Sequence, residues 1–154
     1  MAAHGAIVEW KRGDQPFVDK RYSRAHLWTF DGGEVVRGSS SPSGVPVPLS
    51  DPTAVDPEEA MVASVSSCHM LWFLALAAHA DLVVDSYRDA ASGELDRNEA
   101  GRKYLARITL RPVTAFSGRQ PDQAELDALH HEAHERCEMA NSVRAVITTE
   151  ATIG

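Results

Sequence analysis

The chain has 154 residues, with 15 lysines and arginines against 22 aspartates and glutamates, which gives a formal net charge of -7. This length predicts one domain over residues 1–154, large enough to bury most of its apolar surface without disulfide or metal staples. The acidic balance argues against nucleic acid or an anionic membrane as the main partner, because both repel a protein of this sign. The first residues show no charged segment followed by an apolar one, so the sequence predicts no signal peptide and a cytoplasmic location.

The first third of the chain is strand-like. Short segments rich in β-branched and aromatic residues predict strands over Ala6–Trp10, Ala25–Phe30 and Glu34–Arg37. The Asp-Gly-Gly sequence at residues 31–33 predicts a hairpin turn, because glycine adopts positive φ without strain. Residues 39–57 then carry most of the prolines and predict a long ordered loop, of the kind that is usually functional or covers another part of a domain.

A long helix is predicted after this loop. Asp56 fits the N-cap, Pro57 the first helical position and Glu59 the far side of a capping box. The following run, residues 61–80, is long enough to cross a bilayer but is interrupted by serines and histidines, so we expect a helix buried within protein. A helix that is apolar on nearly every face needs neighbours all around it. One chain of this length can hardly supply them, which predicts a homodimer.

The second half of the chain alternates strands with another helix. Strands are predicted over Leu82–Ala90, Tyr104–Val113 and Val143–Ile153, with a polar turn at residues 92–102. The second helix begins at Asp122, with Glu125 as its capping-box partner. Its apolar stripe has three- and four-residue spacing and comprises Leu126, Leu129, Ala133, Cys137 and Ala140. Cys137 is therefore predicted to face the core.

Two cysteines, Cys68 in the central helix and Cys137 in the second helix, are the main functional signal. Both have serine, histidine or glutamate neighbours at places where a core helix would carry leucine. In a reducing cytoplasm two cysteines more often serve catalysis, redox sensing or metal binding than a permanent structural bridge.

The segments around these cysteines resemble signatures of the OsmC/Ohr family, the osmotically inducible and organic hydroperoxide resistance proteins. DPEEAMVASVSSC, which ends at Cys68, is similar to the family's Pro-Glu…Cys element, and CEMANS, which begins at Cys137, is similar to its second cysteine element. The spacing of the cysteines and the order of the elements also match, so the resemblance extends roughly from Tyr22 to Ile153. It implies a two-layer α+β fold in which antiparallel sheets pack on two long helices in an intertwined homodimer, with active sites at the subunit interface.

The resemblance also implies a peroxidase that uses neither a metal nor an organic cofactor. Cys68 would be the peroxidatic thiol, which attacks the O–O bond of a peroxide and becomes a sulfenic acid. Cys137 would condense with it to a disulfide, which an external dithiol reduces. Several apolar side chains near Cys68 in sequence would suit organic hydroperoxides better than hydrogen peroxide. They are Met61, Met70, Leu71 and Trp72.

A peroxidatic thiol needs a lowered pKa, and for this the resemblance implies an arginine held by the glutamate of the Pro-Glu element. Glu58 occupies that glutamate position. The family's arginine lies beside a glycine turn in the first hairpin, but the turn at residues 31–33 contains none. Arg24 and Arg37 flank the hairpin, and Arg24 is preferred because it lies with His26 on a predicted strand. A protonated His69 is a further candidate for tuning the thiol.

Two alternatives stay open. His130, His134 and Cys137 share one face of a helix, and with His69 they would offer zinc or iron ligands, although the chain has no local Cys-x-x-Cys clamp. Alternatively the fold is kept without peroxidase activity, and the protein binds an apolar ligand or uses its thiols as a redox sensor.

Overall fold

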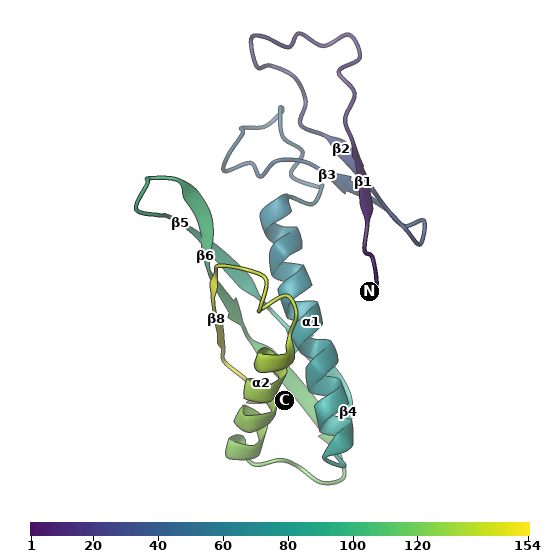
Figure 1. Ribbon diagram of the computed structural model, residues 1–154, viewed down its shortest axis with the longest axis vertical. Helices are drawn as coiled ribbons and strands as arrows, with labels where there is room; N and C mark the ends of the chain where they lie inside the picture. Colours follow the sequence, from purple (N-terminus) through teal and green to yellow (C-terminus); the bar gives the residue numbers. More distant parts are fainter. The chain divides into compact units, whose positions relative to one another are not determined.

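The computed structural model describes all 154 residues, which divide into two compact units, residues 1–60 and residues 61–154 (Figure 1). The first unit contains one antiparallel sheet in the order β1-β2-β3. Its strands are β1 (Ala6–Glu9), β2 (His26–Phe30) and β3 (Val35–Gly38). Gly33 takes a φ of 90° in the turn between β2 and β3. The three predicted strands and the hairpin are therefore confirmed.

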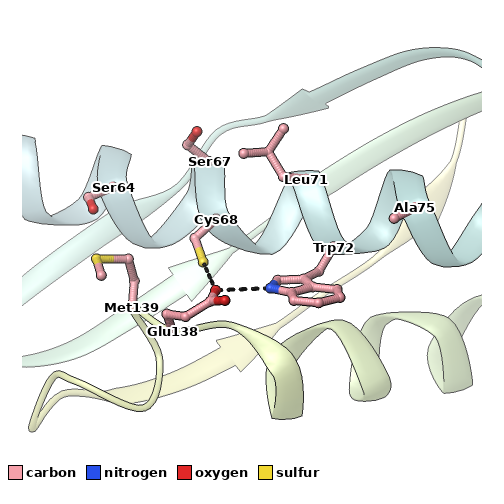
Figure 2. A pocket seen from close by; sticks show the side chains of 8 residues that line it. All are labelled: Ser64, Ser67, Cys68, Leu71, Trp72, Ala75, Glu138 and Met139. Carbon is pink, nitrogen blue, oxygen red and sulfur yellow. Dashed lines mark hydrogen bonds between the residues drawn. The ribbon is translucent and has the colours of Figure 1, made fainter. Parts of the chain in front are cut away.

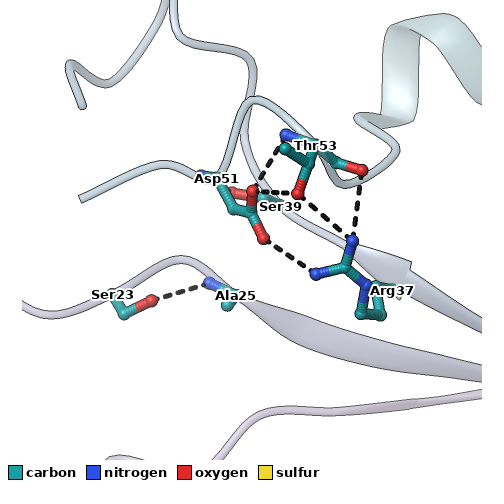
Figure 3. A network of polar contacts seen from close by, with 6 residues as sticks. All are labelled: Ser23, Ala25, Arg37, Ser39, Asp51 and Thr53. Atoms are coloured by element: carbon teal, nitrogen blue, oxygen red, sulfur yellow. Dashed lines mark hydrogen bonds and ion pairs between the residues drawn. The ribbon is translucent and has the colours of Figure 1, made fainter. Parts of the chain in front are cut away.

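The proline-rich loop after β3 is tied back to that strand by a polar network (Figure 3). Arg37 forms an ion pair with Asp51 at 3.3 Å and donates hydrogen bonds to Thr53. Asp51 in turn accepts from the backbone and hydroxyl of Thr53, and its own N–H donates to Ser39 Oγ. The Thr53 hydrogen bonds, assisted by Arg37, lower the pKa of Asp51. The loop is thus ordered, as predicted, and delivers the chain to the start of the long helix.

The long helix, α1 (Pro57–His79), begins as its sequence predicts. Asp56 Oδ1 accepts from the Glu59 N–H at 2.8 Å, and Glu59 Oε2 accepts from the Asp56 N–H at 3.2 Å, which completes a capping box. By length and composition α1 would also reach across a membrane, a test that the core helices of soluble proteins pass too. Only one face of α1 is buried, at four-residue spacing. Its members are Val65, His69, Phe73 and Ala77.

The second unit adds two three-stranded sheets and one more helix. One sheet has the order β4-β7-β9 and the other β5-β6-β8. Their bounds are β4 (Val83–Asp89), β5 (Ser92–Arg97), β6 (Lys103–Leu110), β7 (Pro112–Ser117), β8 (Val146–Thr149) and β9 (Thr152–Ile153), and the helix is α2 (Gln123–Arg136). The β4–β7 and β5–β6 pairs are antiparallel, whereas β8 and β9 run parallel to β6 and β7.

Four details of the sequence prediction are wrong in this unit. The first half of the expected polar turn at residues 92–102 is strand β5, whose side chains are all exposed, so its polar composition concealed it. The strand expected over Tyr104–Val113 breaks at Arg111, where β6 gives way to β7. The closing segment divides into β8 and β9, whose parallel pairing departs from the purely antiparallel sheets expected. Helix α2 ends at Arg136, so Ala140 lies outside its apolar stripe.

At the start of α2 the predicted N-cap is confirmed, but the predicted capping box is not. Asp122 is the N-cap and accepts from the Glu125 N–H at 2.8 Å. The Glu125 side chain instead pairs with Arg119 at 2.7 Å, so the reciprocal bond of a capping box is absent. The charged Arg119 offers the carboxylate a stronger, charge-assisted hydrogen bond than the backbone does.

The buried face of α1 packs on both sheets of the second unit. Toward its C-terminal end Phe73 and Ala77 share a core with Leu126 and Ala133 of α2. Toward its N-terminal end Val65 packs with Ile108 and Leu110 of β6. Helices packed against sheets in this way give the α+β fold that the family resemblance implies. Together the two cores fix the position of α1, and hence of its central residues.

Helix α1 lies close against strand β5 at Gly93. A β-carbon at Gly93 would lie 2.6 Å from Val62 Cγ2 and 2.9 Å from Leu105 Cδ1. Valine is stiff at χ1, so its methyl group has little freedom to withdraw. Glycine at this position therefore allows the helix to lie against the strand.

We expect Gly93→Ala to lower the free energy of unfolding by about 1–3 kcal/mol, because it overpacks this contact. Urea denaturation followed by circular dichroism measures the change. Gly32→Ala is the matched control, since a β-carbon at Gly32 meets nothing within 4 Å. Equal stability of the two variants would show that the helix is not held this closely to β5.

Candidate active site around Cys68

A cavity of about 450 Å³ lies between α1 and the turn that follows α2 (Figure 2). The helix contributes six of its lining residues, which are Ser64, Ser67, Cys68, Leu71, Trp72 and Ala75. The turn contributes Glu138 and Met139. Serines and a carboxylate therefore share the cavity with apolar and aromatic side chains, and the Cys68 thiol lies among them.

The two thiols are neighbours, and both are free. Cys68 is partly buried on α1, while Cys137 is the C-cap of α2 and is fully buried, so the prediction that Cys137 faces the core is confirmed. Cys137 Sγ accepts a hydrogen bond from the Ala140 N–H at 3.3 Å. The Cys137 thiol also lies near enough to that of Cys68 to raise its pKa. The packing of α1 against α2 thus brings together two cysteines that lie far apart in the sequence.

A carboxylate, Glu138, is the third member of the cluster, and the sequence analysis missed it. Cys68 Sγ donates to Glu138 Oε2 at 3.4 Å, and Trp72 Nε1 donates to the same oxygen at 3.0 Å (Figure 2). The Trp72 hydrogen bond, a backbone hydrogen bond and the Cys68 hydrogen bond lower the pKa of Glu138, so the group is ionised at neutral pH. The available signal was its position directly after a cysteine predicted to be buried.

These surroundings hold Cys68 in its protonated form. Burial, the neighbouring Cys137 thiol and the Glu138 hydrogen bond raise the pKa of Cys68 to about 11, although a backbone hydrogen bond from Met139 acts in the opposite direction. The thiolate is the nucleophilic form of cysteine. Nucleophilic chemistry at Cys68 therefore needs a cation near the sulfur or a base that removes the proton.

The other predicted site residues lie in the first sixty residues of the chain. Arg24 donates hydrogen bonds to the carbonyls of Lys20 and Tyr22, and its guanidinium carbon lies 3.9 Å from the centroid of the Tyr22 ring. Arg37 is held by Asp51. Glu58 lies in the first turn of α1 and forms no ion pair within the chain. The catalytic roles of Arg24 and Glu58 stay predictions.

His69 and His130 lie together in the core. His69 Nε2 and His130 Nδ1 lie 2.9 Å apart in the core, and the ring of His130 also stacks on Phe73. Burial is the main cause that lowers the pKa of both histidines to about 4, so His69 is neutral and the expectation of a protonated His69 is wrong. No three side chains among His, Cys, Asp and Glu are placed to hold a metal ion within this chain.

Comparison with known proteins places this fold and site in a family. A family model described as OsmC-like protein matches residues 50–152, and this range includes both cysteines. The chain belongs to the OsmC-like family. It is also 49% identical to an OsmC-like protein of unknown function from Vibrio cholerae, covering 99% of this chain and 100% of that one with a TM-score of 0.96. A search of curated proteins finds no significant match.

More distant solved structures share the OsmC-like fold. An organic hydroperoxide resistance protein from Elizabethkingia anophelis is 18% identical, covers 100% of this chain and 96% of that one, and has a TM-score of 0.72. The organic hydroperoxide resistance protein OhrB of Bacillus subtilis is 16% identical, covers 99% and 98% of the two chains, and has a TM-score of 0.62. The expected family and its α+β fold are therefore confirmed.

The buried histidine pair of this OsmC-like chain gives its stability an acid limit. The pKa of each histidine is lowered from 6.5 to about 4 on folding, so the unfolded chain binds protons that the folded chain does not. The pair therefore costs nothing above pH 6.5. It destabilises the fold progressively as the pH falls toward 4, by up to about 1.4 kcal/mol per pH unit for each histidine.

We expect the free energy of unfolding of the unmodified protein, measured by urea denaturation, to fall steeply between pH 6.5 and pH 4. In His130→Gln, which lacks one of the two buried histidines, it should fall less steeply. His131→Gln is the matched control, because His131 is exposed on the same helix. The pH dependence of His131→Gln is expected to follow the unmodified protein. Identical pH dependence in all three proteins would contradict the assignment of a buried neutral pair.

Proposed function

We propose that the protein is a cysteine-dependent peroxidase that reduces organic hydroperoxides in the cytoplasm, as a defence against oxidative stress. The observation that carries this proposal is the proximity of the Cys68 and Cys137 thiols beside a partly apolar cavity. Membership of the OsmC-like family supports a role in redox stress, and two relatives of the same fold are named organic hydroperoxide resistance proteins.

The proposed reaction has two steps on the enzyme. The Cys68 sulfur attacks the outer oxygen of the hydroperoxide, the O–O bond breaks, and the alkoxide takes a proton to leave as an alcohol, so that Cys68 becomes a sulfenic acid. The Cys137 sulfur then attacks the sulfenic sulfur, water leaves, and a Cys68–Cys137 disulfide remains. An external dithiol supplies the electrons and protons that restore both thiols.

Activation of Cys68 is proposed to require a cation from outside its immediate cluster. The groups in contact with Cys68 raise the pKa of its thiol, so an arginine that reaches the sulfur would offset them. Arg24, positioned by Glu58, is the candidate that the family resemblance implies. The Arg37 guanidinium is already committed to Asp51 and Thr53, which supports the choice of Arg24 over Arg37.

The cavity supports organic hydroperoxides as the substrate class. Leu71, Trp72, Ala75 and Met139 offer an apolar wall for an alkyl or aryl group, while Cys68 lies among them. Burying such a group contributes binding free energy that hydrogen peroxide cannot gain.

We expect Cys68→Ser to abolish cumene hydroperoxide consumption in the presence of a dithiol such as dithiothreitol or dihydrolipoamide, because no nucleophilic thiol remains. Cys137→Ser is expected to reduce one hydroperoxide per Cys68 and then to turn over slowly. Its Cys68 sulfenic acid cannot form the disulfide with Cys137 and must be reduced directly by the dithiol. Ala78→Ser, at an exposed position of the same helix outside the cavity, controls for general damage to α1. Equal rates with cumene hydroperoxide and hydrogen peroxide would contradict the proposed substrate class.

A second candidate function follows from the raised pKa of Cys68. A thiol that stays protonated reacts slowly with peroxide, which suits a protein that binds an apolar ligand, or whose thiols are oxidised only once, better than a fast peroxidase. Under this reading excess hydroperoxide would oxidise the thiols once over minutes, or leave them reduced, and a dithiol would support no turnover.

We also propose that the protein is a homodimer held together by the exposed face of α1. Ser67, Leu71 and Ala75 lie opposite the buried face of the helix, and Leu71 is 61% exposed. A large apolar side chain among small ones on an unpartnered helix face favours association. A partner would also be a source for the cation that Cys68 lacks.

Light scattering after size-exclusion chromatography is expected to give twice the mass of the chain. Ala75→Glu should shift the mass toward that of one chain, because it places a charge in the proposed interface. Ala128→Glu is the matched control, since Ala128 is exposed on α2. A single-chain mass for the unmodified protein would rule out the dimer.

A further inference from the structure

We propose that Glu138 is the catalytic base of the first step: it takes the Cys68 proton and returns it to the departing alkoxide. The proposal rests on the peroxidase function proposed above. It rests geometrically on the 3.4 Å hydrogen bond from Cys68 Sγ to Glu138 Oε2, beside the cavity that both side chains line (Figure 2). A carboxylate in hydrogen-bond contact with the thiol has the position that a base needs.

The same carboxylate oxygen is held in place by a second donor. Trp72 Nε1 donates to Glu138 Oε2 at 3.0 Å, so the acceptor is oriented from α1 while its backbone belongs to the turn after α2. This hydrogen bond also keeps the carboxylate ionised, and therefore ready to accept a proton, at neutral pH. Glu138 forms no ion pair that would compete for this role.

The other charged and titratable groups around Glu138 are few. Helix α1 contributes Cys68, and the end of α2 contributes Cys137 and Arg136. The Arg136 guanidinium carbon lies 5.7 Å from the centroid of the Trp72 ring, and its side chain pairs with Glu132 at 2.6 Å. None of these groups is placed to take the thiol proton in place of Glu138.

Proton transfer resolves a conflict in the electrostatics of the site. A fixed negative charge beside Cys68 disfavours a standing thiolate, which a peroxidase of the usual kind would maintain. If the proton moves to Glu138 as the sulfur attacks, the negative charge passes from the carboxylate to the sulfur and then to the alkoxide. Glu138 is neutral while the alkoxide forms, and it recovers its charge when it protonates the alkoxide. The net reaction is thiol plus hydroperoxide to sulfenic acid plus alcohol.

Glu138→Gln separates this role from that of a mere neighbouring charge. Glutamine has the same shape and still accepts from Trp72, but it cannot take a proton. If Glu138 is the base, the variant should lose roughly a hundred-fold or more in the rate of Cys68 oxidation at pH 7, which is the range of general base catalysis. If Glu138 acts only as a neighbouring charge, the variant should oxidise faster, because removal of the charge lowers the pKa of the Cys68 thiol.

The rate is measured in a Cys137→Ser background, where the reaction stops at the sulfenic acid, by trapping that acid with dimedone after mixing with cumene hydroperoxide. The pH profile is expected to be flat near neutrality with Glu138 and to rise with pH in Glu138→Gln, as thiolate forms without a base. Glu138→Asp, which keeps a carboxylate, should recover part of the rate. Glu135→Gln is the matched control, because Glu135 is exposed and its side chain contacts neither thiol.

If the parent is active at pH 7 and Glu138→Gln reacts as fast or faster, Glu138 is not the base. The proposed peroxidase function is unaffected by that result. A parent that forms no sulfenic acid at any pH overturns the peroxidase and the base together. Slow oxidation of Glu138→Gln, rescued by alkaline pH and by Glu138→Asp, supports both.

Discussion

The contact between α1 and the turn after α2 is the interaction on which the candidate site depends. Phe73 and Ala77 of α1 share a core with Leu126 and Ala133 of α2, and this packing sets one helix against the other. Because α2 ends at Arg136, the chain turns at Cys137 and carries Glu138 over the exposed edge of α1. A shift of α2 by one turn would separate the thiols and open the cavity, so fold and site are not independent.

The site combines groups that oppose each other electrostatically. Cys68 is surrounded by another thiol and a carboxylate, which favour its protonated form, while the nearby histidines are neutral members of the core. A nucleophile in such surroundings needs help at the moment of reaction. A base in contact with the thiol and a cation that arrives from elsewhere are complementary sources of that help, since one removes the proton and the other stabilises the charge left behind.

Local signals in the sequence predicted the parts of the structure that local chemistry decides. The cap at Asp56, the hairpin at residues 31–33 and the core-facing position of Cys137 follow from turn chemistry and periodicity, and the structure has all three. Strand β5 escaped prediction because a fully exposed strand carries no alternation of apolar and polar residues. Glu138 and the His69–His130 pair escaped it because their partners are distant in the sequence and only tertiary packing joins them. The roles of Arg24 and Glu58 depend on the family resemblance and stay predictions.

The central claim is that Cys68 and Cys137 form one redox couple, and peptide mapping of the oxidised protein tests it most directly. The reduced protein is treated with one equivalent of cumene hydroperoxide, alkylated without reduction, digested and analysed by mass spectrometry. The account predicts a single cross-linked peptide that joins the α1 segment containing Cys68 to the segment containing Cys137, with the loss of two hydrogens. Recovery of both cysteines as alkylated thiols would contradict it, as would a disulfide that joins two copies of Cys68.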